Sequence, residues 1–100
     1  MADVEIIAER EGPGSWEFDG QVIDDSGMLH RHTLRLAWSD YNLWSGDGSD
    51  EPARVAEAVL WFLHDRHQDT DDPLRERLDA AIARRLHPDA DDVIPTLINR

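Results

Sequence analysis

The fold is decided by residues 15–38, which read SWEFDGQVIDDSGMLHRHTLRLAW. The first nine residues of this stretch alternate between apolar and polar side chains, with Trp16, Phe18 and Val22 on one face. An Asp-Asp-Ser-Gly turn follows, and the alternation then resumes. A period of two predicts strands, and a turn between two such runs predicts a β-hairpin.

The alternation also extends to the N-terminal side of this hairpin. The predicted strands are Val4–Glu11, Ser15–Ile23 and Met28–Trp38. In the last of them the even positions form the apolar face: Met28, His30, His32, Leu34, Leu36 and Trp38. Because one face is apolar and the other polar, we predict a three-stranded antiparallel meander that is covered on one side.

Helical periodicity replaces the alternation in the second half of the chain. One helix is predicted from Pro52 to about His67, and a second is opened by Asp72-Pro73 and ends before Pro88. A short helical turn follows near the C-terminus. The sequence therefore predicts one α+β domain over residues 1–100, with two helices and this turn packed on one face of the sheet. The expected core pairs Trp16, Phe18, Leu34 and Leu36 of the sheet with Val59, Phe62, Leu78 and Ile82 of the helices.

The charge of the chain excludes several classes of function. Asp and Glu total 22 against 10 basic residues, all arginine, which gives a net charge of −12. A surface this acidic predicts no direct binding to nucleic acid or to an anionic membrane. The carboxylates are spread along the whole chain, which favours a solvated surface over a mimic of a nucleic-acid backbone. The chain has no cysteine, so thiol nucleophiles and Cys-based metal sites are excluded. We expect a cytoplasmic protein.

The histidines are the first candidates for chemistry. His30 and His32 share a strand face, and His64 and His67 share a helix face. If the helix crosses the sheet so that both pairs converge, they could bind zinc. The alternative interpretation places the first pair where the core thins out and the second pair at a helix C-terminus, which favours positive charge.

Other catalytic signals are missing from the sequence. Carboxylate pairs are expected by chance in so acidic a chain, and Glu17, Asp19 and Asp40 fall at positions that the pattern predicts to be exposed. There is no Gly-x-Ser-x-Gly, no glycine-rich phosphate loop and no His-Glu-x-x-His. These observations favour a protein that is not an enzyme.

The connection before the first helix contains Tyr41 and Trp44. Aromatic residues on a loop could anchor a protein partner, because such residues dominate interface hot spots. The alternative is a loop that folds back over the open end of the sheet, since large aromatic side chains seldom stay in water.

The motif order resembles a group of small uncharacterised bacterial proteins. The residues that carry the resemblance are Trp16-x-Phe18, Gly27, His30-x-His32, the Tyr41/Trp44 loop, Pro52, Phe62-Leu63 and Pro88. The chain departs from that group at Gly20, where a larger residue is expected, and at Leu86, where an aromatic often precedes the proline. The resemblance implies strands followed by helices and a bacterial cytoplasmic setting, but no activity and no cofactor.

The preferred functional hypothesis is a non-enzymatic accessory module that binds an unknown protein partner, as a monomer or a weak homodimer. One alternative is a metal-binding protein or metalloenzyme that uses His30, His32, His64 and His67. Another is an acidic mimic that inhibits a basic, nucleic-acid-binding partner.

Overall fold

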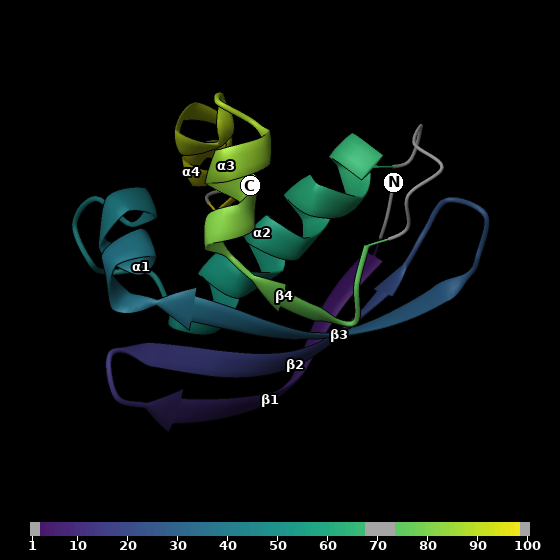
Figure 1. Cartoon of the computed structure of the whole chain (residues 1–100), viewed down its shortest axis with the longest axis horizontal. Helices are drawn as coiled ribbons and strands as arrows, with labels where there is room; N and C mark the ends of the chain where they lie inside the picture. The colour runs from purple at the N-terminus through teal and green to yellow at the C-terminus, as the bar shows by residue number, and fades with distance from the viewer. Residues whose placement is uncertain (1–2, 68–73, 99–100) are drawn as a thin grey trace.

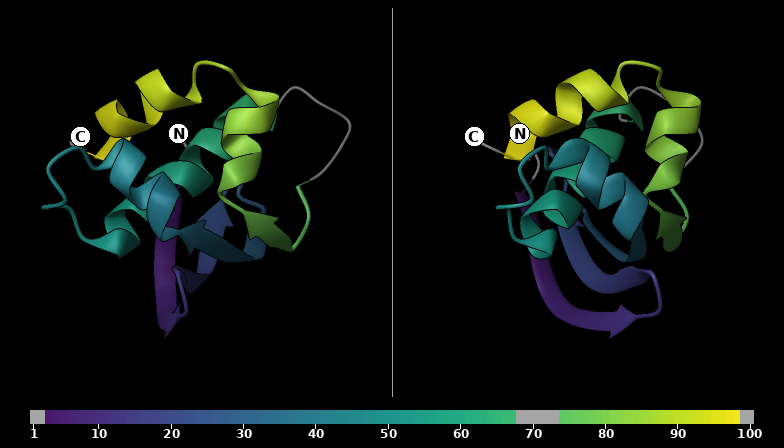
Figure 2. Two further views of the ribbon diagram at one scale, coloured as in Figure 1. Left: turned by 60° about the vertical axis from the view of Figure 1, so that its left-hand side comes forward. Right: turned by 90° about the vertical axis from the view of Figure 1, so that its left-hand side faces the viewer.

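The computed structural model describes residues 3–67 and 74–98 as a sheet with helices on one of its faces (Figure 1). The strands are β1 (Asp3–Gly12), β2 (Ser15–Ile23), β3 (Leu29–Ala37) and β4 (Arg77–Asp79). The helices are α1 (Trp38–Trp44), α2 (Pro52–His67), α3 (Ala81–Leu86) and α4 (Ala90–Ile98). The turned views show the other face of the sheet without a covering helix (Figure 2). The α+β class is therefore confirmed.

The predicted three-stranded antiparallel meander is incomplete. The sheet has four strands in the order β1-β2-β3-β4, and β4 runs parallel to β3. The β1–β2 and β2–β3 pairs are antiparallel, as expected. The register between β1 and β2 shifts between Ile6 and Ala8, and such a bulge increases the local bend of the strand. The result is a mixed sheet with a long edge strand, β1, and a short one, β4.

The prediction of the second helix is wrong over the first half of its length. Its opening at Asp72-Pro73 lies outside the described residues, and Leu78 lies on β4 rather than on a helix. Only α3 and its end before Pro88 match the prediction, and the expected C-terminal turn is the nine-residue helix α4. The pattern failed because Leu78 has helical spacing to Ile82, whereas the partner of β4 is β3, more than 40 residues earlier in the chain.

A further helix, α1, occupies the first part of the predicted connection before α2. The apolar alternation of β3 does not extend to its predicted ends, because Met28 is 61% exposed and Trp38 opens α1 with 45% exposure. The ring of Trp38 still lies against Trp16, with centroids 6.1 Å apart.

The core lies between the sheet and α2, as predicted. Buried residues from both layers form one cluster, which includes Phe18, Val22, Leu34, Leu36, Val59, Leu60, Phe62 and Leu63. Trp16 and Ile82 pack against it while half-buried, and Leu78 joins it from β4. None of the helices in residues 3–67 and 74–98 has the length and apolarity needed to span a bilayer.

Gly20 is required by the packing of α2 on the sheet. A Cβ atom at this position would lie 2.8 Å from Leu60 Cδ1 and 3.5 Å from Ile6 Cδ1. Leu60 is fully buried, so its side chain has little room to move away. The helix thus takes the space that a larger residue at position 20 would fill.

We expect Gly20→Val to lower the free energy of unfolding by about 1–3 kcal/mol through overpacking. Gly20→Val should lower the free energy of unfolding by less in a Leu60→Ala background, where the smaller side chain makes room for the new methyl groups. Such coupling is expected between residues in contact. Urea unfolding of the two single variants and the double variant measures this coupling. Gln21→Val, on the opposite face of β2, serves as the control. Equal costs in both backgrounds would contradict the packing explanation.

Candidate functional site

The crossing of α2 over β3 brings part of the predicted histidine set together. His32 Nε2 and His64 Nε2 are 2.8 Å apart, and the ring centroids of His30 and His64 are 4.9 Å apart. His30 Nε2 also lies 2.8 Å from Asp24 Oδ2 in the β2–β3 turn. We call His30, His32, His64 and Asp24 the histidine cluster.

The hydrogen bonds of His32 determine where protons reside in the cluster. His32 Nδ1 lies 2.8 Å from the carbonyl oxygen of Arg75, and a carbonyl can only accept, so this nitrogen carries the proton. In neutral His32 the Nε2 atom is therefore an acceptor. His64 Nε2–H must then donate to it. This pair is self-consistent when both rings are neutral.

Burial keeps His32 and His64 neutral near pH 7. Desolvation, together with the smaller effects of the neighbouring His32 and His30, lowers the pKa of His64 to about 4. Desolvation also lowers the pKa of His32, which is only 4% exposed. The chain therefore holds two imidazoles that resist protonation until the solution is distinctly acidic.

The fourth predicted histidine lies elsewhere. The ring of His67 packs against that of His87, with centroids 5.6 Å apart, and His87 also contacts Phe62. His87 had no signal in the sequence, because its neighbour lies on a different helix. Among the described residues, no three His, Asp or Glu side chains are arranged to hold a metal ion. The zinc hypothesis gains no support from this geometry and stays a prediction.

Tyr41 and Trp44 are buried within α1 and its following loop, at 9% and 2% exposure. The Tyr41 hydroxyl donates to the carbonyl oxygens of Gly48 and Asp50, and Trp44 Nε1–H donates to Asp91 on α4 at 3.0 Å. These contacts fix the loop and dock α1 on α4. The two aromatic side chains thus lie in the interior, and their role in binding a partner stays a prediction.

A buried carboxylate accompanies this docking, contrary to the expected exposure of Asp40. Asp40 is 4% exposed, and its Oδ1 lies 3.5 Å from Arg84 Nη1. Desolvation raises the pKa of Asp40, while the charge of Arg84 opposes that rise. Arg84 also bonds Asp91 at 3.0 Å, so one guanidinium joins α1, α3 and α4. The arrangement serves to hold helices together.

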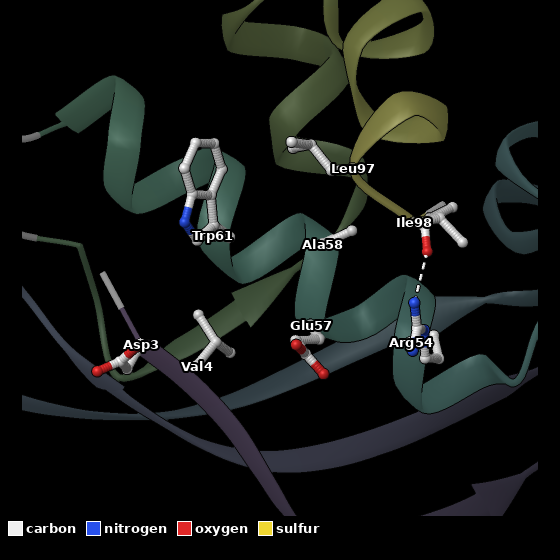
Figure 3. A pocket seen from close by; sticks show the side chains of 8 residues that line it. All are labelled: Asp3, Val4, Arg54, Glu57, Ala58, Trp61, Leu97 and Ile98. Carbon is white, nitrogen blue, oxygen red and sulfur yellow. Dashed lines mark hydrogen bonds between the residues drawn. The ribbon is translucent and has the colours of Figure 1, made fainter. Parts of the chain in front are cut away.

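A pocket of about 340 Å³ lies between the start of β1, the exposed side of α2 and the end of α4 (Figure 3). We call it the β1 pocket. Its more apolar lining consists of Val4, Ala58, Trp61, Leu97 and Ile98, and its charged lining consists of Asp3, Arg54 and Glu57. Arg54 Nη2–H donates to the carbonyl oxygen of Ile98 at 2.9 Å. The guanidinium is thus held at the C-terminal end of α4, where positive charge is favourable.

Two carboxylates line the β1 pocket, those of Asp3 and Glu57. Within residues 3–67 and 74–98, Asp3 and Glu57 form no ion pair. Both are exposed, and both lie on the side of the pocket along which β1 runs (Figure 3). Sequence reasoning missed this site, because its lining comes from three elements that are far apart in the chain.

No family model, curated protein or solved structure matches the chain. The resemblance to small uncharacterised bacterial proteins therefore stays a prediction.

Proposed function

We propose that the protein is a non-enzymatic interaction module that binds its partner at the β1 pocket. The observation that carries the proposal is the position of this pocket beside an edge strand. Its exposed lining is mainly polar and includes the carboxylates of Asp3 and Glu57, and apolar side chains such as Val4 and Trp61 contribute the rest. Its volume of about 340 Å³ lies within the usual range of ligand sites. A pocket of this size accepts a side chain or two of a bound protein. We propose the same cytoplasmic, monomeric or weakly dimeric state that the sequence predicts.

The histidines lie away from the β1 pocket. Of the described residues, those that line the β1 pocket include no histidine. His32 and His64 instead bond each other where α2 crosses β3. No specific contact among the described residues favours the metal-binding or the mimic hypothesis over an interaction module.

Site-specific photo-crosslinking in the native host tests this proposal. A photoreactive amino acid is placed at position 57, inside the pocket, and in a second strain at Asp65, an exposed carboxylate on the same helix outside the pocket lining. We expect a defined adduct with one protein from position 57 and none from position 65. No adduct at position 57, or the same adduct from both positions, would contradict the proposal.

A further inference from the structure

We infer that the partner presents an extended segment that pairs with the first half of β1, with basic side chains beside Asp3 and Glu5 and apolar side chains directed to the β1 pocket. This inference deepens the proposed function and rests on it. It identifies the partner by chemistry: an extended stretch in which arginine or lysine alternates with apolar residues.

The edge of the sheet provides the backbone part of this site. β1 is the ten-residue strand at one end of the strand order, and among the described strands it pairs only with β2. An edge strand presents unpaired N–H and C=O groups that another chain can bind. The opposite edge, β4, has only three residues and offers a much shorter ladder. Strand addition is therefore expected at β1.

The register of β1 determines which side chains an added strand would meet. Val4 and Ile6 pair with Val22 and Gly20 on the helix-covered face, so Asp3 and Glu5 belong to the open face. An added strand alternates in the same way. Its residues on the helix side would lie beside Val4 and the apolar lining of the pocket. Its residues on the open side would lie beside the carboxylates.

The charges along β1 decide which side chains suit the open face. Within residues 3–67 and 74–98, Asp3 and Glu5 on the open face form no ion pair. Glu9 and Glu11 form none either, but beyond the bulge they pair with Phe18 and Trp16 and so belong to the helix-covered face. Arg10, the basic residue of the strand, is already bound to Asp19 at 2.8 Å and to Glu17 at 3.0 Å. Every unpaired charge on β1 is therefore negative. Opposite charges on directly neighbouring strands stabilise pairing, and like charges destabilise it.

The same charges argue against a second copy of the chain as the occupant. Pairing β1 with β1 would bring two rows of unpaired carboxylates together. The bulge between Ile6 and Ala8 also interrupts the edge, and bulges and charges are the usual protection against self-pairing. The segment before the bulge, Asp3–Ile6, is the part of the edge that lies beside the β1 pocket and is open to a basic segment.

Two capped synthetic peptides test the inference on the full chain by ¹⁵N NMR. One alternates arginine with valine over five residues, and the other alternates glutamate with valine. We expect the arginine peptide to shift the amides of residues 3–7 and those around Glu57, with binding that weakens as salt rises. The glutamate peptide should leave these amides unchanged.

Charge variants give the matched comparison. The double variant Asp3→Asn with Glu5→Gln should weaken binding of the arginine peptide by about two- to thirtyfold, the effect of losing two cross-strand charge pairs. Glu11→Gln, on the same strand beyond the bulge, should leave binding unchanged.

The inference is overturned if neither peptide binds, if both bind alike, or if the shifts map away from β1. It is also overturned if β1 amides shift with protein concentration alone, since that would indicate self-pairing. If position 57 still yields a specific adduct, the interaction function stands and only the basic, strand-forming partner is lost. If that adduct is also missing, the proposed function fails with it.

Discussion

Phe18→Ala is expected to lower the free energy of unfolding by about 3–5 kcal/mol, a large part of the total stability of a small domain. Phe18 is fully buried at the centre of β2, where its neighbours are Glu9 on β1 and Leu34 on β3. Truncation removes the transfer free energy of the ring and leaves a cavity between the sheet and the helices. Urea unfolding followed by tryptophan fluorescence measures the loss.

Met28→Ala is the matched control, because the sequence pattern assigns Met28 and Phe18 to equivalent core faces. The structure distinguishes them: Met28 is 61% exposed in the turn before β3, whereas Phe18 is 0% exposed. Met28→Ala should therefore change the stability by no more than about 0.5 kcal/mol. If both variants lowered the free energy of unfolding by similar amounts, Met28 would be a core residue as the sequence pattern predicts, and the described packing would be contradicted.

The sequence predicted the elements whose signals are local. The boundaries of β2 match the prediction, and α2 begins at Pro52 and ends at His67 as expected. Period-two alternation and a proline-opened helical stripe depend only on neighbouring residues, so they can be identified without knowing the fold.

The elements that sequence reasoning missed depend on distant partners. β4 exists because Leu78 and its neighbours pair with Leu34 on β3, and nothing within residues 77–79 indicates a strand. α1 lacks a side-chain cap at Ala37, and contacts such as Asp40 with Arg84 hold it in place. A seven-residue helix is not stable alone, so its position depends on tertiary contacts.

The candidate sites divide in the same way. Strand periodicity places His30 and His32 on the same face of β3. The crossing of α2 over that face then brings His64 next to both rings. His67 could not be assigned from periodicity, because its partner His87 follows α3. The β1 pocket has no motif at all, since β1, α2 and α4 supply its lining separately.

Acid is expected to destabilise the protein between pH 6.5 and about pH 4 because of the histidine cluster. The pKa of His64 is lowered to about 4 by burial and by His32 and His30, and burial lowers that of His32 in the same direction. In the unfolded chain both rings take up protons near pH 6.5. The unfolded state therefore binds more protons over this interval, so the free energy of unfolding falls as the pH falls.

The slope of the free energy of unfolding against pH measures how many more protons the unfolded state binds than the folded state. Each histidine that stays neutral only in the folded state lowers the stability by at most about 1.4 kcal/mol per pH unit. Below pH 3.8 the protonation of carboxylates lowers the stability further. Asp19 is an example, because the hydrogen bonds that it accepts from Arg10 and Thr33 lower its pKa to about 2 in the folded state. Urea unfolding at half-unit pH steps above pH 4 separates the histidine contribution from this later one.

His64→Gln provides the decisive comparison, because the glutamine amide can still donate to His32 Nε2 but cannot titrate. The slope of stability against pH should become shallower by up to one proton in this variant, whatever its stability at pH 7. NMR titration of the His64 ring protons should give a midpoint near 4. A midpoint near 6.5, or an unchanged slope in His64→Gln, would show that the ring is not held neutral by its burial against His32.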